Sequence, residues 1–279
     1  MRSGPENRVS NKVCTPCVAA GPSKRSGQKN DPSPARSATR TVPAMAAAPD
    51  LVLVHGAFHG PWAWDVLRPH LHDRGLATHV VALPSSGGQG GLAADAAALA
   101  DLLDAVPGPK IVVGHSYGGQ VISQGCAGRA DVAGLVYLAA FLLDVGDSVF
   151  SASATLDAAP DGIWIDIDEA TGTATVSDPV DRFYADADPE LTTWAQSRLT
   201  SQTLASLADA LTAAAWREVP STYIATTNDR AIPFAVQQVM AKNAATVHAV
   251  ESSHSPFLSM PERVADILAD AVRTRQKAT

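Results

Sequence analysis

Short, mostly apolar runs alternate along this chain with segments whose apolar residues recur at helical spacing. A short apolar run bounded by turn residues predicts a strand that is buried on both faces of a parallel sheet. Such runs occur at residues 51–54, 78–83, 110–113, 134–140, 221–226 and 246–250. Because helical segments separate them, the pattern predicts an α/β protein with a doubly wound, mostly parallel sheet of about six strands.

Helical spacing is clearest just before the third run, where apolar residues recur on one face and Pro107 ends the pattern. These residues are Leu92, Ala96, Leu99, Leu103 and Val106. Pro61 and Pro233 suit the first turn of a helix, and the helix that Pro61 opens should run to about Arg74. The segment Ser259–Glu262 combines a capping box with a proline and predicts the start of a last helix.

The alternation stops between residues 141 and 220, and an insertion of this length between two sheet strands predicts a cap. Within it, Ile163–Ile167 and Thr173–Val176 flank a turn and predict a hairpin. Pro189–Leu199 and Ser201–Ala214 have helical patterns. We expect the cap to cover a pocket and to set the choice of substrate.

The stretch Lys110–Gln120 leads from an apolar run through Gly-His-Ser-Tyr-Gly into a helical pattern. This arrangement predicts a nucleophile elbow, in which Ser116 lies on a cramped turn between strand and helix. Gly114 and Gly118 supply positions without side chains where the two elements approach each other. The alternative is a glycine-rich turn that holds a structural serine.

A serine nucleophile needs a base to remove its proton and an acid to orient that base. His254 follows the last predicted strand, and Asp229 follows the strand before it. Each has a plainer alternative, since Asp229 could be an acid at a helix N-terminus and His254 a solvated loop residue. Their order after Ser116 favours a triad. Asp144, after the strand that follows the elbow, is the alternative acid.

An oxyanion that forms during acyl transfer needs backbone N–H donors. Tyr117 directly follows the proposed nucleophile and offers the first donor. Ala57, in the loop after the first strand, offers the second, with room left by Gly56. His115 is expected to pack beside the site, and His59 either lines the pocket or makes a structural hydrogen bond.

The charge of the chain is unevenly distributed. Residues 1–48 contain eight Lys and Arg against two acidic residues, a balance of +6, which leaves 13 basic and 26 acidic residues, or −13, in residues 49–279. The acidic body disfavours nucleic acid or an anionic membrane as a partner. Residues 1–48 are polar, lack apolar periodicity and are expected to be disordered, ahead of one domain over residues 49–279.

The cysteines and histidines predict neither a disulfide framework nor a metal site. Cys14 and Cys17 form one Cys-x-x-Cys without a second pair, and Cys126 falls in the helix after the elbow. Such cysteine usage suits a reducing compartment, so we expect a cytoplasmic protein. We also expect the protein to be a monomer or a homodimer. No apolar run approaches the length of a membrane span.

Four segments together resemble the α/β-hydrolase superfamily, and within it small bacterial esterases related to plant methylesterases and hydroxynitrile lyases. They are Val52–Trp64, Gly114–Gly119, Asn228–Pro233 and Ser253–Ser259. The resemblance covers about residues 50–275, is strong at these motifs and is weak in the cap. It implies an α/β-hydrolase fold that lacks the first two sheet strands of the superfamily.

The resemblance also implies roles for particular residues. It makes Ser116 the nucleophile, Asp229 and His254 its partners, and the N–H groups of Ala57 and Tyr117 the oxyanion hole. No cofactor is implied. The expected activity is hydrolysis of a small carboxylic ester through an acyl-enzyme intermediate.

Two positions separate this expectation from a lyase. The resembling lyases have a threonine after the first-strand histidine and a lysine after the catalytic histidine, whereas this chain has Gly56 and Ser255. A departing cyanide anion needs a fixed positive charge nearby, which a serine does not supply. The lyase and a binding module without activity are the alternatives to an esterase.

Overall fold

The computed structural model describes residues 48–155 and 164–278. The predictions for residues 1–47, including the disordered segment and the pair Cys14 and Cys17, lie outside the described residues, as does Ile163 of the predicted hairpin. None of the helices in the described ranges is long and apolar enough to cross a membrane.

The centre of the fold is a parallel sheet of six strands in the order β2-β1-β3-β4-β8-β9. The strands are β1 (Asp50–Val54), β2 (Thr78–Val80), β3 (Lys110–His115), β4 (Val132–Leu138), β8 (Ser221–Thr226) and β9 (Thr246–Val250). All neighbouring pairs run parallel. This sheet confirms the predicted doubly wound α/β fold.

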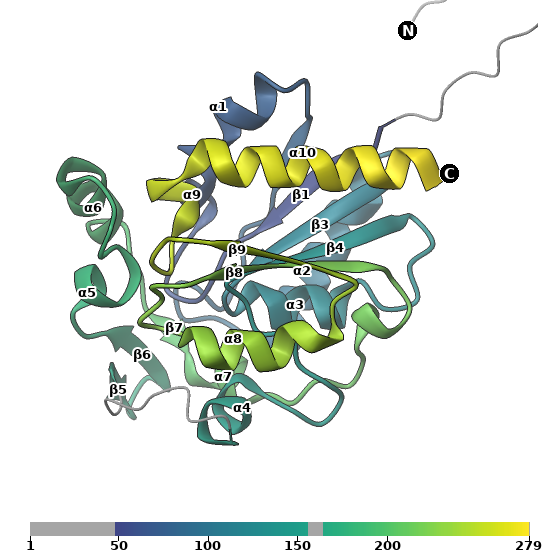
Figure 1. The fold of residues 1–279 in the computed structure, drawn as a ribbon. Helices are drawn as coiled ribbons and strands as arrows, with labels where there is room; N and C mark the ends of the chain where they lie inside the picture. The colour runs from purple at the N-terminus through teal and green to yellow at the C-terminus, as the bar shows by residue number, and fades with distance from the viewer. Residues whose placement is uncertain (1–47, 156–163, 279) are drawn as a thin grey trace, which may run out of the picture. The chain divides into compact units, whose positions relative to one another are not determined.

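Helices cover both faces of the sheet (Figure 1). On one face lie α1 (Leu67–His72), α9 (Pro256–Ser259) and α10 (Pro261–Ala278), and on the other lie α2 (Leu92–Ala105), α3 (Gly118–Gly125) and α8 (Phe234–Met240). Side chains alternate between the faces along each strand. Leu51 and Leu53 therefore join the core under α10, while Val52 and Val54 join the core under α2 and α3.

Two elements predicted near the start of the domain, a helix and a strand, have different bounds in the structure. The helix predicted from Pro61 to Arg74 is a 3₁₀ turn, Pro61–Trp64, followed by the separate helix α1. The strand predicted over Thr78–Leu83 ends at Val80. It lies at the sheet edge, and the N–H of Leu83 leaves the strand pairing to donate to the ring of His55.

The segment between β4 and β8, which we call the cap, contains short elements. They are α4 (Val149–Thr155), β5 (Ile165–Asp168), β6 (Thr173–Val176), α5 (Pro179–Phe183), α6 (Pro189–Gln196), β7 (Gln202–Thr203), α7 (Leu204–Ala208) and a 3₁₀ turn, Ala215–Arg217. The two strands β5 and β6 pair antiparallel, so the predicted hairpin is present. Elsewhere, the 3₁₀ turn Ala241–Asn243 follows α8.

The helix predicted over Ser201–Ala214 is present only over Leu204–Ala208, as α7. Gln202 and Thr203 form β7, which pairs antiparallel with β6 and adds a third strand to the hairpin. Helix α7 begins only after Thr203, whose hydroxyl accepts from the N–H of Ser206 and caps it. It ends at Ala208 because Asp209 adopts an extended backbone conformation.

Candidate active site

Ser116 lies in the sharp turn between β3 and α3. Its φ is +52°, in the left-handed region that a serine rarely adopts. A Cβ at Gly114 would lie 2.5 Å from the carbonyl oxygen of Gly118, and one at Gly118 would lie 2.7 Å from the carbonyl oxygen of Val54. Glycine is therefore required at both positions for strand and helix to pack this closely.

His254 and Asp229 form a buried hydrogen-bonded pair. Nδ1 of His254 lies 2.8 Å from Oδ2 of Asp229, and the two side chains are 1% and 0% exposed. A carboxylate only accepts, so Nδ1 carries the proton and Nε2 is left with its lone pair. This tautomer is the one that a general base requires.

The carboxylate of Asp229 has further donors around it. Oδ1 accepts from the N–H groups of Ala231 and Ile232, both at 2.8 Å. Oδ2 also accepts from the hydroxyl of Thr226 at 2.9 Å and from Nε2 of Gln237 at 2.8 Å. Charge-assisted bonds of this kind are stronger than neutral ones, so they hold the acid in one orientation.

The alternative acid, Asp144, lies elsewhere. It forms an ion pair with Arg217 at the surface, and its side chain is 36% exposed. The hydrogen bond from Arg217 lowers the pKa of Asp144. The structure therefore brings Asp229, and not Asp144, to His254.

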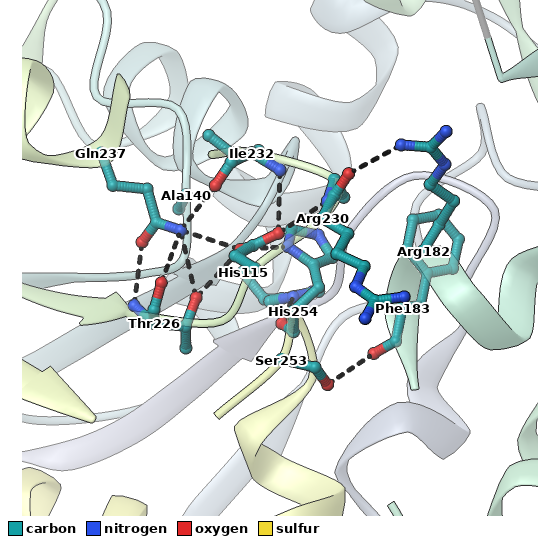
Figure 2. Close-up of polar contacts among 12 residues, drawn as sticks. His115, Ala140, Arg182, Phe183, Thr226, Arg230, Ile232, Gln237, Ser253 and His254 are labelled. Carbon is teal, nitrogen blue, oxygen red and sulfur yellow. Dashed lines mark hydrogen bonds and ion pairs between the residues drawn. The ribbon is translucent and has the colours of Figure 1, made fainter. Parts of the chain in front are cut away.

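Figure 2 shows Phe183 of the cap on one side of His254 and Gln237 of α8 on the other, where Gln237 contacts Asp229. The rings of Phe183 and His254 have centroids 5.5 Å apart. The N–H of Ser253 donates to Oδ2 of Asp186 at 2.9 Å, which ties the loop just before His254 to the cap. The cap thus fixes the position of the histidine loop.

Ser116 and His254 line one cavity of about 800 Å³, when the space at its mouth is included. Ala57, His59 and Tyr117 also line it. The remaining lining is apolar except for Ser153: Phe58, Phe141, Val149, Phe150, Trp164, Ile165, Phe183, Leu207, Ala231 and Ile232. Among the described residues, no Lys, Arg, Asp or Glu lines the cavity.

The two predicted oxyanion donors lie at this cavity, and neither the N–H of Ala57 nor that of Tyr117 donates a hydrogen bond within the described part of the chain. The carbonyl of Gly56 accepts from Nδ1 of His55 at 2.9 Å. In a trans peptide the carbonyl and the following N–H point in opposite directions, so this bond orients the N–H of Ala57.

His55 and His59 are neutral because they are buried. Burial lowers the pKa of His55 to about 4 and that of His59 to about 3. The ring of His59 donates from Nδ1 to the carbonyl of Ala57 at 2.8 Å and accepts at Nε2 from the hydroxyl of Tyr184 at 2.8 Å. The expected structural hydrogen bond and pocket position of His59 therefore occur together.

His115 packs beside the site, as expected. Its Nε2 lies 3.0 Å from the carbonyl oxygen of His254, and the two ring centroids are 4.7 Å apart. Burial lowers the pKa of His115 well below its usual value. A neutral ring at this position adds no charge next to His254.

Three polar residues near the site were missed from the sequence: Asp95, Gln202 and Gln237. For Asp95 a signal existed, because it lies three residues after Leu92 and four before Leu99, on the apolar face of α2. It is fully buried and accepts from the hydroxyl of Tyr117 at 2.6 Å.

Known proteins resemble this chain in sequence and in fold. The sequence model that represents the alpha/beta hydrolase family matches residues 51–267 of this chain. An α/β hydrolase of Aspergillus novofumigatus, nvfD, is 30% identical over an alignment 243 residues long, which covers 80% of this chain and 96% of that protein. A pyrethroid hydrolase of Sphingobium wenxiniae is 30% identical over an alignment 245 residues long, which covers 79% of this chain and 86% of that protein.

Among solved structures, the crystal structure of a pyrethroid hydrolase from Sphingobium faniae is similar, with a TM-score of 0.72 and 26% sequence identity. The similarity covers 81% of this chain and 98% of that one. With the family match over most of its length, this chain belongs to the α/β hydrolase family.

Proposed function

We propose that this protein is a serine hydrolase that cleaves neutral carboxylic esters, with Ser116, His254 and Asp229 as its catalytic triad. The observation that carries the proposal is the buried bond between His254 and Asp229 beside a cavity that Ser116 also lines. The names of related proteins, which include hydrolases and esterases, support ester cleavage.

In the first step Nε2 of His254 takes the proton of the Ser116 hydroxyl while Oγ attacks the ester carbonyl carbon. The carbonyl electron pair moves onto oxygen, and the N–H groups of Ala57 and Tyr117 donate to that oxyanion. One such donor contributes about 10²–10³ in rate. Asp229 remains a carboxylate and stabilises the imidazolium.

The tetrahedral intermediate then collapses and its bond to the alcohol oxygen breaks. The imidazolium of His254 gives its proton to the departing alcohol, which leaves an ester between Ser116 and the acyl group. A water molecule then attacks the acyl carbon while Nε2 of His254 takes one of its protons. The second tetrahedral intermediate collapses, the bond from the acyl carbon to Oγ of Ser116 breaks, and the imidazolium returns the proton to Oγ, which releases the acid and restores Ser116.

The cavity lining favours a neutral substrate with apolar groups. A charged group on the substrate would lose its hydration on entering this space and find no opposite charge among the described lining residues. Aromatic side chains such as Phe150, Trp164 and Phe183 instead offer contact area to an apolar acyl or alcohol group.

The lyase alternative has less support. A Cβ at Gly56 would lie 2.9 Å from the Cβ of Ser116, so a threonine there would require the turn to shift. Ser255 is a neutral residue whose buried hydroxyl has no hydrogen-bond partner among the described residues. A departing cyanide would therefore meet no fixed cation beside His254.

Covalent labelling tests the proposal. The wild type should react with a fluorophosphonate at Ser116, located by peptide mass spectrometry, and should hydrolyse neutral p-nitrophenyl esters. Ser116→Ala should abolish labelling and lower kcat by about 10³–10⁶. Ser197→Ala is the control, because Ser197 is exposed and donates to the carbonyl of Trp194.

Three results would overturn the proposal. They are labelling at a different serine, a Ser116→Ala variant that keeps most of its activity, and release of cyanide from mandelonitrile without hydrolysis of any ester. Tight binding of an ester without labelling or turnover would favour the binding module instead.

A further inference from the structure

Gln202, in the cap strand β7, is fully buried, and its side chain makes four hydrogen bonds. Its Oε1 accepts from the N–H of Phe58 at 3.2 Å and from the hydroxyl of Ser86 at 2.9 Å. Its Nε2 donates to the hydroxyls of Ser85 and Ser206, both at 2.6 Å. Every donor and acceptor of this amide is used, so its orientation is fixed.

One set of these bonds holds the loop that carries the first oxyanion donor. Phe58 follows Ala57 and has a φ of +65°, a left-handed conformation that is unfavourable for a residue with a side chain. Its N–H is held by Gln202, and its carbonyl accepts from the N–H of Thr200 at 2.9 Å. Two cap residues thus maintain a strained backbone immediately after Ala57.

The other set reaches the second oxyanion donor. The hydroxyl of Ser85, which accepts from Gln202, donates to Oδ2 of Asp95 at 2.5 Å. The same carboxylate oxygen accepts from the hydroxyl of Tyr117 at 2.6 Å. Tyr117 is 1% exposed, so its side chain is anchored at this buried carboxylate.

These bonds form one continuous path through Gln202, Ser85 and Asp95 between the two sides of the oxyanion hole. We propose that Gln202 is a positioning residue that keeps the N–H groups of Ala57 and Tyr117 at the separation an oxyanion requires. The inference rests on the proposed function and extends it, because it makes strand β7 of the cap part of the geometry of catalysis.

The expected changes in kcat and KM depend on the stage of the reaction at which the oxyanion is present. It forms in the transition state and not in the bound substrate, so a displaced donor lowers kcat and leaves KM nearly unchanged. We expect Gln202→Met, which keeps the length of the side chain, to lower kcat about 10–100-fold, a fraction of the loss of a whole donor. KM should change less than about threefold.

A matched control is Gln124→Met. Gln124 in α3 also joins the sheet domain to the cap, since Oε1 accepts from the N–H groups of Thr212 and Ala213 and Nε2 donates to Thr212. Within the described part of the chain, its side chain makes no hydrogen bond to the loop that carries Ala57. If the effect came only from weaker packing of the cap against the sheet, both variants would show it. If it comes from displaced N–H groups of Ala57 and Tyr117, only Gln202→Met should show it.

The affinity for a trifluoromethyl ketone is a second measurement, and it should not change if the role of Gln202 is purely structural. The ketone adds to the proposed nucleophile and places an oxyanion in the hole, so its affinity should fall in Gln202→Met in parallel with kcat/KM. Binding of the alcohol product, which carries no oxyanion, should stay the same. Equal kcat and ketone affinity in Gln202→Met and Gln124→Met would overturn the inference.

Ser85→Ala keeps the test decisive if Gln202→Met does not fold. It removes the hydroxyl that links Gln202 to Asp95, while the N–H of Ser85 still donates to Oδ1 of Asp95. It should still lower kcat with little change in KM, and an unchanged kcat would overturn the inference. Failure of the proposed function is recognised separately, because the wild type itself would then not be labelled at Ser116.

Discussion

Nδ1 of His254 lies 2.8 Å from Oδ2 of Asp229, with both side chains almost completely shielded from solvent. The same oxygen also accepts from Gln237 and Thr226, and these two side chains hold the carboxylate of Asp229 in place. An imidazolium forming here would gain its main stabilisation from this carboxylate.

Replacing the acid tests that relationship. Asp229→Asn should lower kcat about 10⁴-fold, the order seen when a triad acid becomes an amide that selects the wrong tautomer. Asp144→Asn should change kcat less than about twofold, because Asp144 pairs with Arg217 at the surface. Both values come from initial rates with a neutral p-nitrophenyl ester, and an exchange of the two effects would reassign the acid.

The close approach of β1 and α3 predicts unequal costs for two glycine substitutions. In Gly118→Ala the new Cβ would meet the carbonyl oxygens of Val54 and His55 at 2.7 Å, and backbone atoms cannot move aside easily. We expect the free energy of unfolding, measured in urea, to fall by more than about 3 kcal/mol.

Gly128→Ala is the matched control. Gly128 has a φ of +71° but nothing within 4 Å of an added Cβ, so only the cost of the left-handed conformation, about 1–2 kcal/mol, should appear. Equal losses in the two variants would mean that the contact with β1 at position 118 costs no more than a left-handed conformation, which would contradict the prediction.

The sheet could be predicted well because its strands are buried on both faces and read as apolar runs. Strands β8 and β9 have the predicted bounds, residues 221–226 and 246–250. Helix α2 ends within one residue of its predicted end at Val106. The positions of Asp229 and His254 at neighbouring strand ends followed from the same pattern.

The cap could not be predicted equally well, because its elements depend on long-range pairing. Gln202 and Thr203 lie in a stretch with helical spacing, yet they pair with β6 about 30 residues earlier. The hydrogen bonds of Gln202 with Phe58 and Ser85 likewise join segments more than a hundred residues apart. No local sequence pattern predicts such contacts, so only the structure could show that Gln202 contacts the loop that carries Ala57.

A charge placed at the mouth of the cavity should alter substrate preference. Phe150 lines the cavity and is 37% exposed, so an arginine there can keep its guanidinium in water. Phe150→Arg should raise kcat/KM for p-nitrophenyl hemisuccinate, an anionic ester, about 3–10-fold relative to neutral p-nitrophenyl butyrate. Phe150→Gln controls for lost aromatic area, and an equal shift in that variant would exclude a charge effect.

The buried histidines should make stability fall as the pH drops below about 6.5. In that range the unfolded chain binds a proton at each histidine, while His55 and His59, with their pKa lowered to about 4 and about 3, remain neutral in the fold. Each therefore removes about 1.4 kcal/mol of stability per pH unit until its folded pKa is reached.

His59→Asn tests this effect, because asparagine keeps a donor near the carbonyl of Ala57 but cannot titrate. Between pH 5 and 6, the slope of the free energy of unfolding in urea against pH should be smaller in this variant by about 1 kcal/mol per pH unit. The exposed His72→Asn should leave the slope unchanged, and a His59→Asn slope equal to that of the wild type would mean that His59 is protonated within the fold.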